Sequence, residues 1–178
     1  MTRQKAIHFL RDVGCPANVI EHCLSVERVA SKIAEKIRAN RHRIDIEVVR
    51  IGALLHDVGR AQTHNIEHGV RGGEILRSNG LGEFAKFAEN HIGAGIPAEE
   101  AKELGLPNRD FIPRSLEEKV VAYADKLVEG KRVVPYAKAV ERFKRELGDG
   151  HPALERFERL HEEIRRLTRK GDPSCTGS

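Results

Sequence analysis

Several residue types are scarce in this chain of 178 residues. Tryptophan is absent and aromatic residues make up only 4%, so the core must be aliphatic, which favours packed helices over an aromatic-rich β-sandwich. The three cysteines are an odd number without a C-x-x-C pair, which excludes a disulfide framework and a cysteine zinc site. No signal peptide or membrane-length apolar run of roughly 20 residues occurs. We therefore expect a cytoplasmic protein that does not enter a membrane.

The composition is otherwise that of a folded globular chain. Hydrophobic residues make up 39% and charged residues 33%, and the length suits one domain, or one domain with a short appendage. The formal net charge is +4, from 31 basic and 27 acidic residues. This surface is mixed, and without an aromatic platform or a basic stripe it does not predict nucleic-acid binding. A modest positive bias suits a small phosphorylated partner.

Helical periodicity, broken by glycine and proline, runs through the whole sequence. We predict an all-α fold, a helical bundle of about eight helices, with no convincing strand pair. Asp45 is an expected N-cap, and Ser115 with Glu118 forms an expected capping box. The helical segments are expected near residues 2–12, 16–39, 46–57, 70–78, 83–91, 97–104, 115–129, 136–147 and 152–169.

Four polar residues stand where this periodicity demands apolar ones. His22 and Asp125 each lie on an apolar helical stripe, and His56 and Asp57 end the apolar run of a third helix. A carboxylate buried alone would cost several kcal/mol, so Asp125 needs a partner. Each residue taken alone has an ordinary structural explanation, such as a core histidine or a helix-to-helix hydrogen bond. Together, two imidazoles and two carboxylates form a coherent metal-ligand set.

The chemistry of these ligands limits which metal ions can bind. Mixed nitrogen and oxygen ligands suit a divalent transition metal such as iron, manganese, cobalt or nickel, and suit magnesium less well. Open coordination positions would admit water and a phosphate oxygen. The metal would lower the pKa of its water and polarise the phosphorus centre.

Three sequence segments carry a family resemblance. HCLSVERVA from His22, LLHDVGR from Leu54 and VAYADKLV from Val120 resemble the three signatures of the HD-domain superfamily of helical, metal-dependent phosphohydrolases. The chain is similar to HDIG-type members, including uncharacterised archaeal HD proteins. The resemblance covers roughly residues 16–130. It implies an HD-domain-like helical bundle with one metal site, whose ligands are His22, His56, Asp57 and Asp125. It also implies a catalytic centre at Asp57 and His56.

Two further histidines match an element of the di-metal HD subgroups. EHGVRGGEIL contains His68, and ENHIGAG contains His91. By resemblance to these subgroups, which include diadenosine tetraphosphate hydrolases, they would bind a second metal, with Asp57 bridging the two. Without that metal, both are phosphate-binding or surface residues. The paired histidines and GYP motif of HD-GYP proteins are missing, because Asn90 precedes His91, so cyclic-di-GMP cleavage is not expected.

Four residues are candidates for contacting substrate. Arg60 follows the HDVG turn and can pair with a phosphate. Lys126 follows Asp125, although it could equally face water. Backbone N–H groups at Gly93 and Gly95 can cradle an anion, as many glycine turns can.

The organisation follows from these motifs. We expect an HD-type phosphohydrolase domain over residues 1–134, two C-terminal helices packed on the same domain over 135–170, and a disordered tail over 171–178. The C-terminal helices offer a surface for a homodimer.

We therefore predict a phosphomonoesterase or phosphodiesterase that acts on a nucleotide-like substrate through a metal-activated water. The alternatives are a dinucleoside-polyphosphate hydrolase with a di-metal site, supported by His68 and His91 alone, and a non-catalytic HD-fold binding or signalling module. Intact metal ligands argue against the module.

Overall fold

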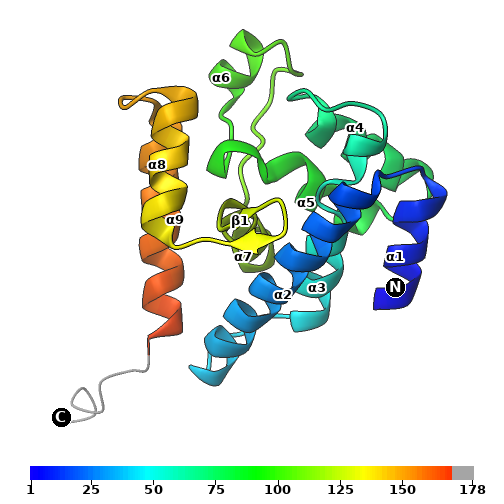
Figure 1. Cartoon of the computed structure of the whole chain (residues 1–178), viewed down its shortest axis with the longest axis horizontal. Coiled ribbons are helices and arrows are strands. Elements are labelled where there is room, and N and C mark those ends of the chain that lie inside the picture. The colour runs from blue at the N-terminus through cyan, green and yellow to red at the C-terminus, as the bar shows by residue number, and fades with distance from the viewer. Residues whose placement is uncertain (170–178) are drawn as a thin grey trace.

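The fold was described from a computed structural model, in which residues 1–169 are placed (Figure 1). It confirms the all-α prediction, with nine α-helices in that part of the chain instead of about eight. The expected tail at 171–178 lies outside the described residues. The α-helices are α1 Arg3–Asp12, α2 Ala17–Ala39, α3 Ile46–Leu55, α4 His68–Ser78, α5 Ala85–Asn90, α6 Ala98–Glu103, α7 Leu116–Lys126, α8 Tyr136–Leu147 and α9 Pro152–Thr168. Short 3₁₀ helices are η1 Val58–Ala61, η2 Gly82–Phe84 and η3 Ile92–Ala94, and the strands are β1 Val128–Glu129 and β2 Arg132–Val133.

The predicted helix caps are present. The Asp45 side chain accepts hydrogen bonds from the backbone N–H groups of Glu47 and Val48 at the start of α3. Ser115 and Glu118 form the capping box of α7. These side chains satisfy N–H groups that have no partner inside the helix, and so they fix where the two helices begin.

The core forms around α2, α3 and α7, which pack against one another in the middle of the molecule (Figure 1). Their facing stripes are aliphatic and fully buried, as at Val26, Leu54 and Val121. This packing matters for the site because His22 lies on α2, Asp125 lies on α7 and His56 caps the end of α3. A smaller apolar cluster of Ile96 and Phe111 with their neighbours lies beneath α6.

The helix predicted to reach Glu129 is shorter than expected. It ends at Lys126, and the next residues form a β-hairpin in which Val128 pairs with Val133 and Glu129 pairs with Arg132. The prediction of no strand pair was therefore wrong. Gly130 turns this hairpin with φ +58°, a backbone conformation that glycine adopts readily. Helical periodicity could not register a two-residue strand.

The helix predicted over 83–91 is also divided. It consists of η2 and the six-residue helix α5, which ends at Asn90 and leaves His91 as its C-cap. Helix α3 likewise ends at Leu55 rather than Asp57. His56 and His91 thus cap these two helices with backbone angles that are still right-handed helical, and both side chains are buried.

The two closing helices lie along one edge of the molecule (Figure 1) and pack against each other. Phe143 of α8 and Phe157 of α9 are buried in the same apolar core as the preceding helices. Tyr123 of α7 lies against Phe157, with ring centroids 6.0 Å apart. Across residues 1–169, none of the helices combines the length and apolar character that a bilayer crossing requires.

Candidate metal centre

Helices α2 and α7 bring His22 and Asp125 together, although they lie 103 positions apart. The Nε2 atom of His22 is 2.9 Å from Oδ1 of Asp125. The other ring nitrogen, Nδ1, lies 2.8 Å from the backbone carbonyl oxygen of Gly130. The β-hairpin that follows α7 thus supplies a carbonyl that fixes the ring of His22.

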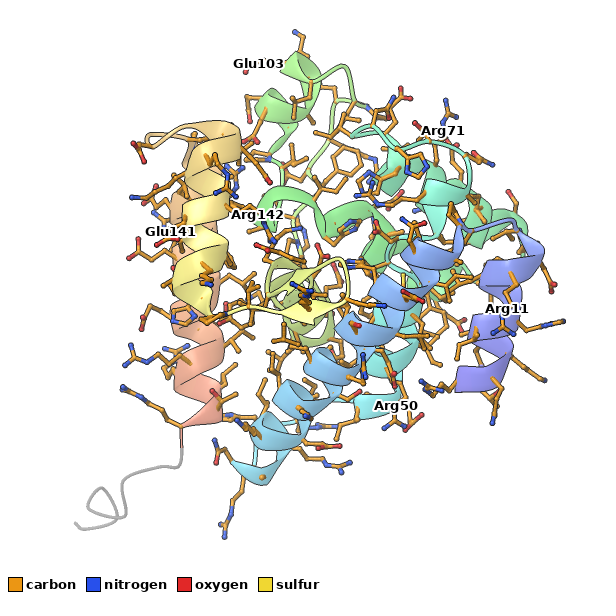
Figure 2. All side chains as sticks on the ribbon, viewed as in Figure 1. Arg11, Arg50, Arg71, Glu103, Glu141 and Arg142 are labelled. Atoms are coloured by element: carbon orange, nitrogen blue, oxygen red, sulfur yellow. The ribbon has the colours of Figure 1, made fainter. Side chains whose placement is uncertain are left out.

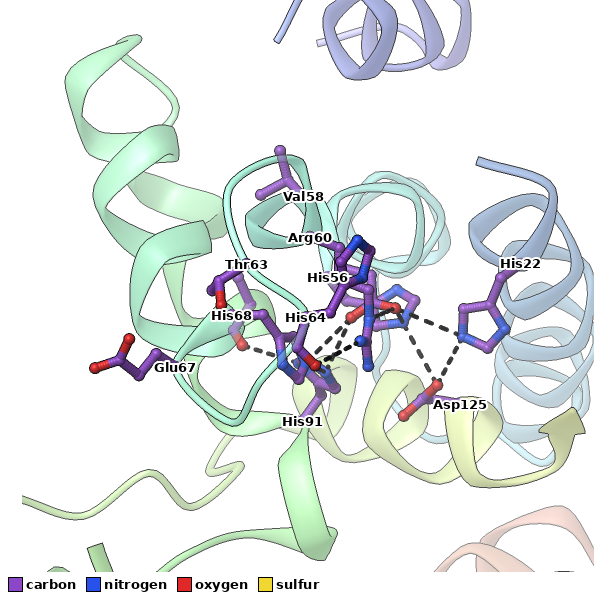
Figure 3. A network of polar contacts seen from close by, with 12 residues as sticks. His22, His56, Val58, Arg60, Thr63, His64, Glu67, His68, His91 and Asp125 are labelled. Carbon is purple, nitrogen blue, oxygen red and sulfur yellow. Dashed lines mark hydrogen bonds and ion pairs between the residues drawn. The ribbon is translucent and has the colours of Figure 1, made fainter. Parts of the chain in front are cut away.

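The adjacent pair at the end of α3 completes this group (Figure 3). His56 is fully buried, and Asp57 is 4% exposed. The His56 Nδ1 atom lies 2.7 Å from the Ala53 carbonyl oxygen, and its Nε2 atom lies 3.5 Å from Asp125 Oδ1. The structure therefore brings His22, His56, Asp57 and Asp125 into one cluster.

Figure 3 shows His68 and His91 on the side of the cluster away from His22, and both histidines approach Asp57. Their Nε2 atoms lie 3.3 and 3.5 Å from Asp57 Oδ1. Their Nδ1 atoms face the carbonyl oxygens of Asn65 and Ala88, at 2.6 and 2.8 Å. The opposite carboxylate oxygen of Asp57, Oδ2, lies 3.9 Å from Nε2 of His56 and 4.0 Å from that of His22.

One pattern unites the four imidazoles. Each presents Nδ1 to a backbone carbonyl oxygen, which can only accept a hydrogen bond, so each neutral ring carries its proton on Nδ1. Each Nε2 atom then turns a lone pair toward the carboxylates, which are themselves acceptors when ionised. His56 Nε2 and Asp57 Oδ1 are buried without a hydrogen-bond partner. This set of acceptors fits a metal cation, and Nδ1–H bonding to carbonyls is the usual support for metal-binding histidines.

The electrostatics agree with this arrangement. Burial raises the pKa of Asp57, but His56 and the close approach of His68 and His91 outweigh this effect and hold the pKa well below its usual range. The pKa of Asp125 is also held well below its usual range, by Lys126 and His22, against the effect of burial. Both carboxylates are therefore anionic at neutral pH.

The histidines differ in how their surroundings act on them. Burial lowers the pKa of His91 to about 4, so this ring is neutral. At His22, burial lowers the pKa, but the hydrogen bond with Asp125 raises it overall. The short contact between these two side chains thus requires a positive charge, either a proton on His22 or a bound cation.

Two groups of side chains could each hold an ion. One is His22, His56 and Asp125, and the other is His56, Asp57 and His91, with ligand atoms within 4.8 Å of one another. His68 belongs to neither group, but its Nε2 atom is 3.2 Å from that of His91. Because Asp57 turns one oxygen toward each side, the arrangement has the form of a two-metal site with a shared carboxylate.

Close backbone packing places His68 beside Asp57. A Cβ atom on Gly59, two residues after Asp57, would lie 1.8 Å from the His68 carbonyl oxygen, and one on Gly72 would lie 2.8 Å from the Cβ of Ala88. Only glycine allows η1, α4 and α5 to approach so closely.

A cavity of about 260 Å³ opens onto five of the six side chains, and His56 is fully buried outside its lining. Arg60 lines it and donates from Nε to Asp57 Oδ2 at 2.8 Å. Lys126 also lines it, and its ammonium group pairs with Asp125 Oδ2. Gly93 and Gly95 are not among the lining residues, and the Gly95 N–H donates to the Ile92 carbonyl.

Sequence reasoning missed the part of the cavity that α8 supplies. Arg142, Phe143 and Glu146 line it beside Ile92 and Val128. No motif marks these residues. The signal that could have found them is the spacing of Arg142 and Glu146, four apart on one face of an amphipathic helix that also carries Phe143.

Comparison with known proteins places the chain in one family. A family model described as "HD domain" matches residues 19–130. An uncharacterized protein of Methanocaldococcus jannaschii, MJ0778, is 48% identical over 168 residues, which cover 94% of this chain and 99% of that protein. No solved structure matches the chain.

Two further relatives are longer proteins. Those named tRNA (cytidine(56)-2'-O)-methyltransferase in Picrophilus torridus and Thermoplasma volcanium are both 39% identical, over 147 and 160 residues. The matches cover 82% and 89% of this chain, but only 41% and 45% of the methyltransferases. The chain thus spans less than half the length of these two proteins.

Proposed function

This chain belongs to the HD-domain family, and we propose that it is a metal-dependent phosphohydrolase that cleaves a phosphate ester of a nucleotide-like substrate. The observation that carries the proposal is the convergence of four Nε2 lone pairs on the carboxylates of Asp57 and Asp125, beside a cavity lined by Arg60 and Lys126. This combination joins a cation site to an anion site, as phosphate-ester hydrolysis requires.

The residues divide into two overlapping ligand groups. His22, His56 and Asp125 would hold one metal, His68 and His91 a second, and Asp57 would contribute an oxygen to each. A transition metal such as iron, manganese, cobalt or nickel suits these ligands best. When bound, it supplies Lewis acidity toward the phosphoryl group and lowers the pKa of a water molecule.

The protein's own groups position the reaction. Asp57 accepts a hydrogen bond from the attacking water and orients it toward phosphorus. The water oxygen forms a bond to phosphorus, the ester P–O bond breaks, and the leaving oxygen takes up the proton that the water gives up. Arg60 and Lys126 exchange their carboxylate partners for phosphoryl oxygens, whose growing charge they stabilise.

The cavity favours a small substrate. Its volume of about 260 Å³ is slightly below the usual range of roughly 300–1,000 Å³ for small-molecule sites. A mononucleotide-sized phosphate ester suits this space. We propose no binding of nucleic acid. A cytoplasmic location and a homodimer through α8 and α9 stay predictions.

The longer relatives add an indirect argument. Both methyltransferases are named for a reaction on a cytidine of tRNA, which supports a substrate with nucleotide chemistry. Methyl transfer itself is not part of the proposal, because the chain covers under half of each protein.

Two other functions are kept as alternatives. The proximity of His68 and His91 to Asp57 favours, as a second candidate, a di-metal dinucleoside-polyphosphate hydrolase. A non-catalytic binding module would need the same fold but no turnover. Comparing diadenosine tetraphosphate with mononucleotides as substrates separates the two hydrolases.

The proposal is tested with a generic substrate. Protein loaded with manganese or iron should hydrolyse bis-p-nitrophenyl phosphate, and Asp57→Ala should abolish that activity. The matched control is Asp12→Ala, which removes an exposed carboxylate at the end of α1 and should leave the rate unchanged. Hydrolysis that survives both Asp57→Ala and chelation would refute the assignment.

A further inference from the structure

Helix α8 closes one side of the candidate active-site cavity. Arg142 and Glu146 line the cavity together with the edge of Phe143. Figure 2 shows Arg142 extending from α8 toward the body of the molecule, whereas Glu141 points away from it. These residues lie beyond position 130, where the match to the HD-domain model ends. They are therefore features of this chain's C-terminal segment, outside the matched domain.

The guanidinium group of Arg142 already has partners within the protein. Its guanidinium donates to the Lys126 carbonyl oxygen at 2.8 Å and pairs with Glu129 Oε1 at 2.9 Å. The Arg142 side chain is 16% exposed. It therefore fastens α8 to the end of α7, next to Asp125, and Glu129 offsets its charge.

Glu146 differs from Arg142 in its exposure to solvent and in the pairing of its charge. It is exposed, one helical turn further along the same face, and within residues 1–169 no ion pair or hydrogen bond engages its carboxylate. Three apolar side chains, Ile92, Val128 and Phe143, line the same cavity. A ligand that places its phosphate at Arg60 and Lys126 would thus share the cavity with apolar side chains and one unpaired negative charge.

We propose that Glu146 is a specificity-determining residue, which selects phosphate esters whose leaving group is uncharged and carries hydroxyl groups, such as a nucleoside with an intact ribose. The inference rests on the proposed function, because it takes the phosphate end of the cavity as given. A carboxylate accepts hydrogen bonds from sugar hydroxyls, as acidic residues in nucleotide sites do. The same charge disfavours a second phosphate at this position.

The test measures binding, so that it does not depend on turnover. The probes are methylenephosphonate analogues of AMP, 2',3'-dideoxy-AMP and ADP, in which the bond to the leaving group is not hydrolysed. Calorimetry is carried out on the manganese-loaded full chain and on variants Glu146→Ala and Glu146→Gln. Glu141→Ala and Glu141→Gln are matched controls, since Glu141 lies on the outward face of the same helix.

Glu146→Ala should weaken binding of the AMP analogue about tenfold or more, as expected for losing hydrogen bonds to a charged acceptor, and leave the dideoxy analogue within about twofold. Glu146→Gln should narrow the preference for the AMP over the ADP analogue. The Glu141 variants should match the wild type. An equal loss for both sugar forms, an unchanged AMP affinity in Glu146→Ala, or no binding of the AMP analogue to the wild type would overturn the proposal.

Failure of the proposed function has a different signature. Bis-p-nitrophenyl phosphate has neither a sugar nor a second phosphate, so its hydrolysis tests the metal centre without Glu146. If the wild type hydrolyses this ester but Glu146→Ala binds both sugar forms as the wild type does, only the role of Glu146 is wrong. If the wild type does not hydrolyse it with any of the metals, the function is wrong.

Discussion

His68 and His91, 23 positions apart in the chain, turn their Nε2 atoms to within 3.2 Å of each other. Each ring is held from behind by the carbonyl oxygen of the residue three positions earlier, Asn65 or Ala88. Because both Nδ1 atoms carry their protons toward these carbonyls, two lone pairs face each other beside Asp57 Oδ1. Such a contact is unfavourable by itself, and a cation bound by both rings would make it favourable.

The first prediction concerns metal stoichiometry. Wild-type protein should bind two divalent transition-metal ions per chain, and His91→Ala should bind one, because His22, His56 and Asp125 remain in place. Inductively coupled plasma mass spectrometry of the reconstituted protein measures the ratio. His8→Ala, which removes an exposed histidine of α1, should leave the ratio at two. A wild-type ratio of one would contradict the second site.

The second prediction concerns the glycine contact that places His68. Gly59→Ala puts a methyl group where the His68 carbonyl oxygen leaves no room, at 1.8 Å, so η1 and α4 must separate. We expect a loss of about 3 kcal/mol or more in the free energy of unfolding, at the upper end of overpacking effects, with loss of the second metal. Chemical denaturation and metal analysis measure the two effects.

Gly82→Ala is the matched control for this substitution. A Cβ atom there would meet only the side chain of Arg77, at 3.6 Å, an ordinary contact. Its stability should change by less than about 1 kcal/mol. Equal stability losses at Gly59 and Gly82 would show that the close approach of η1 and α4 is unimportant.

The sequence predicted the all-α class and the identities of the clustered side chains for a physical reason. Polar residues such as His22 and Asp125 interrupt apolar helical stripes, and burying them is tolerable only if they meet partners. Periodicity therefore reveals both the helices and the residues that need one another. The HD resemblance added His68 and His91, which no stripe marks.

Other parts of the site could not be predicted from local pattern. The β1–β2 hairpin depends on a single glycine turn at Gly130, and its functional atom is a backbone carbonyl, which any residue could supply. The position of α8 over the cavity depends on how Phe143 packs against Phe157, with ring centroids 5.1 Å apart. Such long-range packing leaves no periodic trace in the sequence.

The third prediction concerns Cys15 and pH. Burial, with a smaller effect of Asp57, raises the pKa of this thiol from 9.0 to about 11. The folded state therefore holds the Cys15 proton between pH 9 and 11 whereas the unfolded state releases it, so stability falls as pH rises through this window. Wild-type protein should lose unfolding free energy more steeply than Cys15→Ala between pH 9 and 11, by at most about 1.4 kcal/mol per pH unit.

Denaturant titrations at half-unit pH steps measure this difference. A Cys175→Ser background removes the cysteine that lies outside the described residues. Cys15 should also resist thiol reagents at pH 8 in the folded state, because it is 8% exposed and protonated. Rapid labelling of Cys15 in folded protein, or parallel slopes for the two variants, would contradict the assignment of a raised pKa.

The last prediction asks whether the two C-terminal helices fold with the rest of the domain. Phe157 of α9 is fully buried, and its ring lies 5.2 Å from that of Tyr136 and 6.0 Å from that of Tyr123 on α7. Phe157→Ala should therefore cost about 3–5 kcal/mol. Thermal unfolding should stay a single transition at a lower temperature, because the cavity lies in the shared core. Leu147 also belongs to this helix pair, at the end of α8, but it is 42% exposed. Leu147→Ala should change stability by about 0.5 kcal/mol or less. Should Phe157→Ala instead produce a separate early transition confined to residues 135–169 by hydrogen exchange, these helices would form an independent unit, and α8 could not hold Glu146 at a fixed place beside the metal centre.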